Sequence, residues 1–283
     1  MIQRFLTALV ILLSGFASAR AEVHLFKLRQ PDAIKADDYS RPQRQSQWCW
    51  AACGEMALRS QGVNDIDQAR LVASIRGVPA NTPAYARELA RALTGMTRDR
   101  LAGVVVSQAL VYERKGDGRF VAGNSWMNAP AMAFLLAHGM PVIVLYKTGG
   151  SVGHFVLING VSLDSEHPLQ AVHYQVEDPW PLDKEGQPLA VTSGVRKQLE
   201  ARSLEANAIA FVVPIIVADT NVNQMKSYLD NVKRLEQNPK AFRFDDLVHI
   251  AEQSNVEVEK FDSPEVLKEN VRPKQDESSD GPE

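Results

Sequence analysis

Three residues of this chain have the types and local settings that nucleophilic catalysis by a thiol needs. Cys49 lies in the segment Gln43–Cys53, which holds both cysteines and two of the four tryptophans of the 283-residue chain. Much further along the chain, His154 follows a glycine-rich stretch and Asp178 comes directly before a proline. A thiol nucleophile needs a base, and the base needs a partner that fixes its orientation. We therefore predict that Cys49 is a nucleophile, His154 its base and Asp178 the orienting carboxylate.

The two cysteines are predicted to have different roles. Cys49, Ala52, Cys53 and Met56 recur at the spacing of one buried helix face. Cys49 falls in the first turn of this predicted helix, where unpaired backbone N–H groups and the helix dipole favour a thiolate. A cysteine on an apolar face is usually an inert, buried thiol, and we assign that role to Cys53. The helical spacing of the two residues is poorly suited to a disulfide between them.

An oxyanion donor is also expected near the thiol. Gln43 lies six residues before Cys49, and an amide at that distance can fold back beside the thiol. Together with the backbone N–H of Cys49, it would donate hydrogen bonds to the oxyanion that develops during acyl transfer. Gln45 and Gln47 compete with Gln43 for this role.

The base and the carboxylate each have a plainer structural alternative. A strand histidine is often a satisfied structural residue, and His173, on the strand before Asp178, is the rival candidate for the base. Asp-Pro is common in turns, so Asp178 has a purely structural interpretation as well. The order Cys, His, Asp along the chain favours the catalytic interpretation, because all three parts of a triad are present.

Three elements must bring these side chains together. A helix is predicted from residue 46 or 47 to about residue 60. His154 begins an apolar segment over 154–160 that is predicted to be a strand, and Asp178 follows a second predicted strand over 172–177. Antiparallel pairing of these two strands would place His154 and Asp178 at the same edge of a sheet, beside an open cleft.

The rest of the chain is interpreted as further helices and strands. Pro141–Tyr146 is a continuous apolar run of the kind that fills a central strand. Pro214 interrupts the last apolar segment, which indicates an edge strand or a bulge there. The remaining strands are predicted over 23–28 at an edge, 103–113, 119–122 and 208–217, and the remaining helices over 65–75, 83–93, 128–138, 191–202, 222–235 and 244–251.

The two ends of the chain differ in composition from its middle. Residues 1–21 have a basic start, an apolar stretch and small residues in a cleavage pattern, which predicts an export signal, with a retained signal anchor as the alternative. Residues 22–218 form the predicted core domain. Residues 219–271 carry amphipathic patterns and are expected to form a small helical appendage. Residues 272–283 are polar and are predicted to be disordered.

The composition argues against several partners and cofactors. The net charge of −3 gives no reason to expect a nucleic-acid partner. Apart from Cys49 and Cys53 the chain has no second pair of cysteines, and it has no closely spaced pair of histidines, so a zinc site is not expected. No further apolar stretch follows the signal that is long enough to span a membrane. We therefore expect no metal, no cofactor and no membrane contact once the signal is cleaved.

Taken together, the motifs resemble papain-like cysteine peptidases. They look most like a bacterial branch that includes bacteriocin-leader-processing peptidase domains and secreted effector peptidases of plant pathogens. The resemblance covers about half of the chain and rests on Gln43, Trp48–Ala52, Pro141–Val144, Gly153–Leu157 and Asp178–Pro181. The sequence departs from papain in having Asp178 where papain has Asn. It also lacks the Cys-Gly-Ser-Cys pattern of papain with its paired disulfide.

The resemblance implies an α+β fold with two lobes, in which an N-terminal catalytic helix faces an antiparallel β-sheet. It also implies a triad of Cys49, His154 and Asp178 with Gln43 at the oxyanion, no cofactor, and a protein or peptide substrate. With the export signal, these expectations describe a periplasmic or secreted cysteine peptidase. Two alternatives stay open. One is acyl transfer by the same triad, as in transglutaminases or amidases. The other is a non-catalytic papain-like module that docks a protein partner on its C-terminal helices.

Overall fold

The computed structural model of the chain describes residues 22–30, 34, 36–98, 104–123, 125–148, 153–180, 195–218, 230, 244–253 and 258–261. The predicted export signal, the tail 272–283 and most of the predicted helix 222–235 lie outside these residues. Of the helices within them, none is long and apolar enough to cross a lipid bilayer. In chain order the elements are β1 (Val23–Lys27), α2 (Ala36–Tyr39), α3 (Cys49–Arg59), α4 (Gln68–Arg76), α5 (Ala86–Arg98), β2 (Val104–Arg114), β3 (Phe120–Ala122), β4 (Ser125–Met127), α6 (Ala129–Ala137), β5 (Val142–Lys147), β6 (Gly153–Asp164), β7 (Ala171–Asp178), β8 (Val195–Glu200), α7 (Ala201–Asn207), β9 (Ala208–Ala218), α9 (Phe244–Gln253) and β10 (Val258–Phe261).

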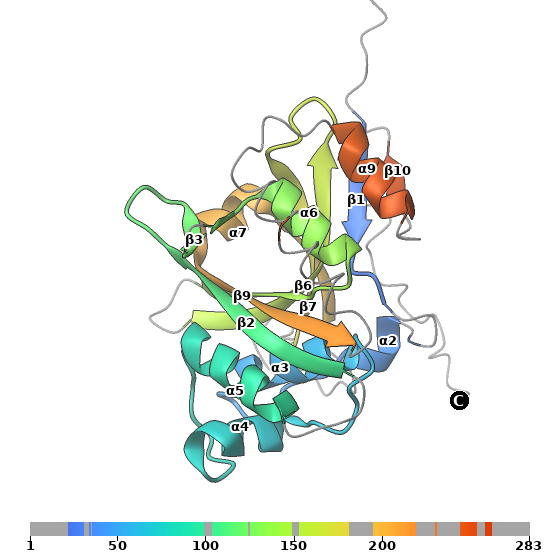
Figure 1. Cartoon of the computed structure of the whole chain (residues 1–283). Helices are drawn as coiled ribbons and strands as arrows, with labels where there is room; N and C mark the ends of the chain where they lie inside the picture. Colours follow the sequence, from blue (N-terminus) through green and yellow to red (C-terminus); the bar gives the residue numbers. More distant parts are fainter. Residues whose placement is uncertain are drawn as a thin grey trace, which may run out of the picture.

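A ten-stranded antiparallel sheet dominates the fold (Figure 1). Its strand order is β10-β1-β6-β5-β9-β2-β3-β4, with β7 paired to β6 and β8 paired to β7. β6 is the branch point, because its first half pairs with β5 and its second half with β1, while β7 pairs along its other side. The predicted α+β class and the antiparallel pairing of the strands that carry His154 and Asp178 are confirmed.

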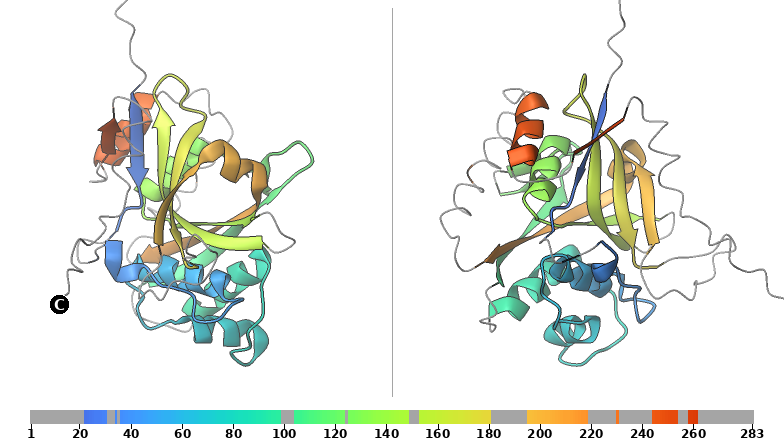
Figure 2. Two further views of the ribbon diagram at one scale, coloured as in Figure 1. Left: turned by 180° about the vertical axis from the view of Figure 1, so that it is seen from behind. Right: turned by 90° about the vertical axis from the view of Figure 1, so that its right-hand side faces the viewer.

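The apolar sequence of β5 explains why both faces of the sheet are covered. β5 lies between β6 and β9, as its continuous apolar run predicts. Successive side chains of a strand point to opposite faces. Ile143 and Leu145 pack with α3, α4 and α5, whereas Val142 and Val144 pack with α6. Helices α2 to α5 accordingly gather on one side of the sheet, at the bottom of Figure 1, and α6 lies with α9 on the other (Figures 1 and 2).

Helix α3 is the centre of the helical layer. All its residues from Trp50 to Leu58 are buried. At Gly54 a Cβ atom would lie 3.0 Å from Leu71 of α4 and 3.3 Å from Leu89 of α5. The missing side chain therefore lets both helices approach α3 closely. The helix begins at Cys49, a few residues later than the sequence predicts.

Several predicted boundaries and element types differ from the structure. The prediction of a helix over 191–202 is wrong, because residues 195–200 form β8 and helix α7 begins only after them. β8 is at most half-buried and has a weak local pattern, so its pairing with β7 decides its conformation. β1 is not an edge strand, because β10 pairs with its outer side. Helices α4 and α5 begin a few residues late, at Gln68 and Ala86, with Asp67 as the N-cap of α4.

β9 lies in the interior of the sheet, although Pro214 indicated an edge strand or a bulge. The proline is accommodated because β5 pairs with β9 only as far as Val212, while Pro214 lies opposite Ala109 of β2. A residue without an N–H fits where a strand has a neighbour on one side only. The predicted edge character therefore holds locally and not for the whole strand.

The described part of the C-terminal region packs against the same core. Helix α9 agrees with the predicted helix 244–251 and buries Leu247 and Ala251. The ring of Phe244 lies 4.4 Å from that of His24 on β1. β10 then pairs antiparallel with β1. β10 is therefore the outermost strand at this end of the sheet, next to β1.

Candidate active site

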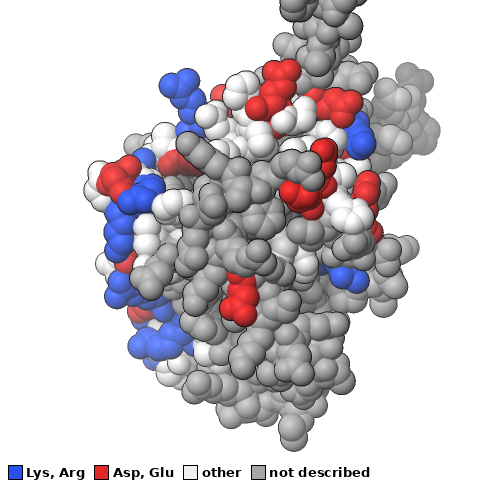
Figure 3. All heavy atoms as spheres, turned by 45° about the horizontal axis from the view of Figure 1, so that its top comes forward, with Lys and Arg blue, Asp and Glu red and all other residues white. Residues whose placement is uncertain are grey.

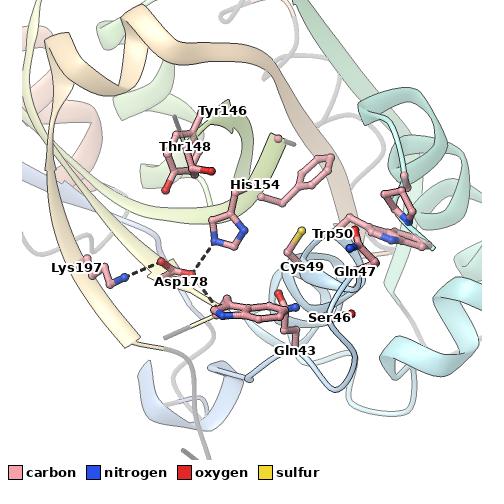
Figure 4. Close-up of a pocket in the computed structure, with 15 residues that line it drawn as sticks. Gln43, Ser46, Gln47, Cys49, Trp50, Tyr146, Thr148, His154, Asp178 and Lys197 are labelled. Carbon is pink, nitrogen blue, oxygen red and sulfur yellow. Dashed lines mark hydrogen bonds and ion pairs between the residues drawn. The ribbon is translucent and has the colours of Figure 1, made fainter. Parts of the chain in front are cut away.

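The predicted triad residues meet in a cleft between the start of α3 and the ends of several strands (Figure 4). Cys49 comes from the first turn of α3, His154 from the start of β6 and Asp178 from the end of β7. Gln43, from the segment before α3, also lines this cavity, which has a volume of about 480 Å³. The structure thus brings all four sequence candidates to one place.

Two tryptophans hold the start of α3 in place. The indole N–H of Trp48 donates to the carbonyl oxygen of Ala80 at 3.0 Å, and that of Trp50 to Thr82 at 3.1 Å. Both tryptophans are buried, whereas Cys49 between them is half-buried and reaches the cleft. Because Cys49 is the first helical residue, its N–H has no acceptor within the helix. The helix start therefore brings both a thiol and a backbone donor to the cleft.

His154 and Asp178 are directly hydrogen-bonded. The Nε2 of His154 lies 2.8 Å from Oδ1 of Asp178, and the two side chains are 17% and 7% exposed. This contact leaves the Nδ1 of the imidazole for the thiol, and Cys49 lies in the same cleft, near enough to influence the pKa of His154. Figure 4 shows the side chains of Cys49 and His154 next to each other in the cleft. The order thiol, imidazole, carboxylate is that of a catalytic triad.

The carboxylate of Asp178 accepts hydrogen bonds on both of its oxygens. Its Oδ1 also accepts the backbone N–H of Trp180 at 2.9 Å. Its Oδ2 accepts from the ammonium group of Lys197 at 2.8 Å, a contact drawn in Figure 4. Burial disfavours the charged form, but the hydrogen bonds and charges of His154 and Lys197 outweigh it and lower the pKa of Asp178. The carboxylate therefore stays ionised beside the imidazole at neutral pH.

Lys197 is a site residue that the sequence does not reveal. It lies on β8, a segment whose sequence favours a helix. β8 pairs antiparallel with β7, with Val195 opposite Asp178 and Lys197 opposite Val176. Only this pairing brings the lysine to the carboxylate, and no local pattern in the sequence indicates it.

His154 is protonated at neutral pH in this environment. Burial alone would favour the neutral ring. The hydrogen bond to Asp178, the nearby Cys49 and the charge of Asp178 outweigh burial and raise the pKa of His154 from 6.5 to about 9. An imidazolium is a proton donor, and here it lies beside the nucleophile candidate Cys49. The site can therefore hold a nucleophile and a proton donor side by side before any substrate binds.

Gln43 is held at the cleft by its backbone. Its N–H donates to the carbonyl oxygen of Pro179, directly after the triad carboxylate, at 2.8 Å. Its side-chain amide nitrogen donates to the carbonyl oxygen of Gln45 at 2.8 Å, which uses one of two N–H bonds. Figure 4 shows Gln43 below Cys49 in the cleft. Gln47 lines the cleft as well, whereas Gln45 is exposed and is not part of the lining.

A buried glutamine on α4 clamps both neighbours of Gln43. Gln68 is 1% exposed. Its Oε1 accepts the N–H of Arg44 at 2.9 Å, and its Nε2 donates to the carbonyl oxygen of Pro42 at 2.9 Å. The same Nε2 donates to Glu55 of α3 at 3.0 Å. A buried polar group must find hydrogen-bond partners. This network therefore fixes the segment around Gln43 to α3, the helix that carries Cys49. Nothing in the sequence indicated it.

A second buried carboxylate ties the same segment to the end of β7. Glu177 accepts a hydrogen bond from the hydroxyl of Ser40 at 2.9 Å. It also accepts from the amide of Asn159 at 2.9 Å and from the guanidinium of Arg196 at 2.8 Å. The residues before α3 are therefore anchored both to the helix and to the strand that ends at Asp178.

Cys53 and His173 are not part of the cleft lining. Cys53 is a free thiol with no exposed surface, and burial, more than its neighbours, raises its pKa well above the ordinary value. It belongs to the core, as predicted. His173 is buried on β7 and does not line the cleft.

The chemistry of the cleft follows from its side chains. Within the described ranges, no group of three or more His, Cys, Asp or Glu side chains is placed to hold a metal ion. A half-buried thiol, an imidazolium, a carboxylate and amide donors are instead suited to nucleophilic acyl transfer. No protein-family model matches the chain, and no curated protein matches it either. The geometry of the cleft is therefore the main guide to its function.

Proposed function

We propose that this chain is a papain-like cysteine peptidase that hydrolyses peptide bonds in protein or peptide substrates outside the cytoplasm. The observation that carries the proposal is the 2.8 Å contact between His154 and Asp178, made in the cleft that Cys49 also lines from the start of a helix. A purely structural histidine has no need of this alignment in an open cleft. The predicted export signal over 1–21 supports a periplasmic or secreted location.

The proposed reaction begins when the thiolate of Cys49 attacks the carbonyl carbon of the peptide. A C–S bond forms, and the carbonyl oxygen becomes an oxyanion that accepts hydrogen bonds from the N–H of Cys49 and the amide of Gln43. The intermediate collapses when the imidazolium of His154 gives its proton to the leaving nitrogen. The C–N bond breaks, the amine product leaves and a thioester remains on Cys49.

Hydrolysis of the thioester completes the cycle. The neutral ring of His154 takes a proton from water as the water oxygen attacks the thioester carbonyl. The C–S bond then breaks, the acid product leaves, and the thiolate and imidazolium are restored. Asp178 orients the ring throughout and stays ionised, because Lys197 and His154 stabilise its charge.

The two walls of the cleft support the papain-like assignment. One wall comes from the helical layer, through Trp50 and residues 83–84. The other comes from the sheet, through Tyr146 and Phe155. A thiol on a helix facing an imidazole on a sheet is the two-lobed organisation that the sequence motifs resemble.

A direct test compares the chain lacking residues 1–21 with its Cys49→Ala variant on a periplasmic or extracellular protein extract. New peptide termini that form with the active protein and are missing with the variant would establish the activity and give its cleavage sites. Cys53→Ala is the matched control, because it changes the other thiol at a core position. Identical termini from the active protein and Cys49→Ala would contradict the proposal.

The same samples separate hydrolysis from the alternatives. If an added primary amine became attached to side-chain carboxamides without backbone cleavage, the triad would belong to an acyl transferase of the transglutaminase type. If Cys49→Ala kept the full biological activity, the chain would be a binding module. Backbone cleavage that depends on Cys49 is the result we expect.

A further inference from the structure

A second cavity lies on the opposite side of the sheet from α3, next to the hairpin formed by β2 and β3. Its volume is about 380 Å³, and it shares no lining residue with the cleft around Cys49. Its walls come from the hairpin, the start of α6, β7, α7 and β9. None of the proposed peptidase chemistry uses it. A volume of this size is within the range of small-molecule sites.

The floor of this cavity is apolar and closely packed. The rings of Phe120 and Phe211 meet edge to face with centroids 4.7 Å apart. Met127 and Met132 lie beside them, and all four side chains are buried. Such a floor favours an apolar or aromatic group of about the size of one side chain.

Arg114 is fixed at the rim above this floor. Its guanidinium carbon lies 5.7 Å from the centre of the Phe120 ring. One of its nitrogens donates to the carbonyl oxygen of Ala206 at 2.6 Å. That carbonyl is uncharged, so the contact orients the guanidinium without neutralising it.

Two further arginines extend the positive rim. Arg119 lies over the ring of Trp126, but Asp117 pairs with it and offsets its charge. Arg202 lines the cavity, is exposed, and makes no ion pair within the described part of the chain. Figure 3 shows Lys and Arg gathered at the left of the molecule, the side on which the hairpin lies in Figure 1. Arg114 and Arg202 are therefore the arginines of the lining for which the described residues provide no ion-pair partner.

Glu205 is the acidic side chain among the described residues of the lining. The hydroxyl of Tyr174 donates to its carboxyl group at 2.5 Å. Burial raises the pKa of Glu205, and the hydrogen bond from Tyr174 opposes that rise only in part. This hydrogen bond holds the carboxyl group of Glu205 against the ring hydroxyl of Tyr174.

Asn128 lines the cavity, and the orientation of its side-chain amide is known. Its Oδ1 caps α6 by accepting the N–H of Ala131 at 2.8 Å. The opposite end of the amide must then be the nitrogen, Nδ2. This nitrogen is buried and finds no acceptor among the described residues. A buried donor without an acceptor is costly, and the oxygen of a ligand would satisfy it.

We propose that this cavity binds a small amphipathic carboxylate. The apolar group of the ligand rests on Phe120 and Phe211, and its carboxylate faces Arg114, Arg202 and Asn128. The C-terminal residue of a peptide and a free aromatic acid both have this chemistry. The proposal does not depend on the peptidase activity.

Calorimetric titration of the Cys49→Ala protein with three probes tests the proposal. N-acetyl-L-phenylalanine represents a peptide C-terminus, 3-phenylpropanoate a free aromatic acid, and N-acetyl-L-phenylalaninamide lacks the charge. Because a charged hydrogen-bond partner is lost, we expect the amide to bind about tenfold or more weakly than the matching acid. Tighter binding of the peptide-like acid would identify peptide C-termini as the source, and tighter binding of the other acid would identify free acids.

Two variants locate the binding site. Arg202→Gln removes an exposed cation, and Asn128→Asp keeps a good helix cap while replacing the free donor with a negative charge. We expect each to weaken binding of the acid by about tenfold. Arg70→Gln, which changes an exposed arginine outside the cavity, should have no effect. Equal binding of acid and amide, no saturable binding, or equal losses in Arg70→Gln and Arg202→Gln would overturn the proposal.

Discussion

The ammonium group of Lys197 lies 2.8 Å from one oxygen of Asp178, while His154 bonds to the other oxygen at the same distance. The carboxylate that orients the imidazole is therefore held between two cationic groups. They come from β6 and β8, the strands on either side of β7. Lys197 fixes the carboxylate, and it also competes with His154 for its negative charge.

Lys197→Met should therefore shift the pH profile of catalysis to higher pH. Without the competing cation, Asp178 favours the imidazolium more strongly, so the pKa of His154 rises and the alkaline limb of kcat/KM moves to higher pH. We also expect kcat/KM to fall by about tenfold, because a charge-assisted hydrogen bond that fixes the carboxylate is lost. The exposed Lys147 gives a matched control, Lys147→Met, whose profile should match the unmodified protein. A shift toward lower pH would contradict this view of Lys197.

If the proposed function is right, the unmodified protein should stay active well above the ordinary pKa of histidine. The imidazolium of His154 must give a proton to the leaving nitrogen, and its pKa is about 9. Activity should therefore persist as the pH rises past 6.5 and decline as it passes through about 9. Asp178→Asn removes the main charge that favours the imidazolium. The alkaline limb of the kcat/KM profile of this variant should therefore lie at lower pH. Profiles of kcat/KM for a cleaved peptide measure both, and an alkaline limb near 6.5 in the unmodified protein would refute the proposed role of His154 as proton donor.

Gln43→Ala should separate oxyanion stabilisation from thiol reactivity. Loss of one oxyanion donor typically lowers kcat by about 10²–10³-fold. Alkylation of Cys49 by iodoacetamide forms no oxyanion, so its rate should hardly change. Gln45→Ala is the control, because that side chain is exposed and outside the cleft. If alkylation fell as far as catalysis, Gln43 would have a general structural role instead.

Gln68→Leu should impair catalysis through the position of Gln43. The substitution removes the hydrogen bonds to Pro42 and Arg44 and leaves Glu55 without one of its partners. We expect kcat to fall with little change in KM, and stability to fall by about 1–3 kcal/mol. Kinetics and chemical denaturation measure the two effects.

Ser74→Ala serves as the control for this variant. It removes a side-chain hydrogen bond on the same helix, α4, and that bond does not involve the segment around Gln43. It should lower stability without lowering kcat. Equal effects of both variants on kcat would show that Gln68 acts through stability alone.

The candidate site was largely predictable because its parts carry local signals. A helix start at Cys49, a glycine before His154 and an aspartate at a strand end are each visible within a few residues of sequence. The continuous apolar run of β5 likewise indicated a central strand, because only a strand covered on both faces needs it.

The parts that were missed depend on contacts between distant segments. β8 has no clear strand period, so its pairing with β7, and with it the position of Lys197, could not be predicted. Gln68 resembles an ordinary polar helix residue until the segment around Gln43 packs over it. β1 and β10 lie near opposite ends of the chain, and their pairing has no local signature.

The rate at which Cys49 reacts with iodoacetamide near pH 6 tests the central claim most directly. If His154 activates the thiol as we propose, Cys49 in the folded protein should react at least about tenfold faster than in the denatured protein. Cys53 should stay unlabelled in the folded protein, because it is fully buried. His154→Gln should remove the enhancement without unfolding the protein. If Cys49 reacted equally fast in His154→Gln and in the unmodified protein, the two residues would not form a catalytic pair.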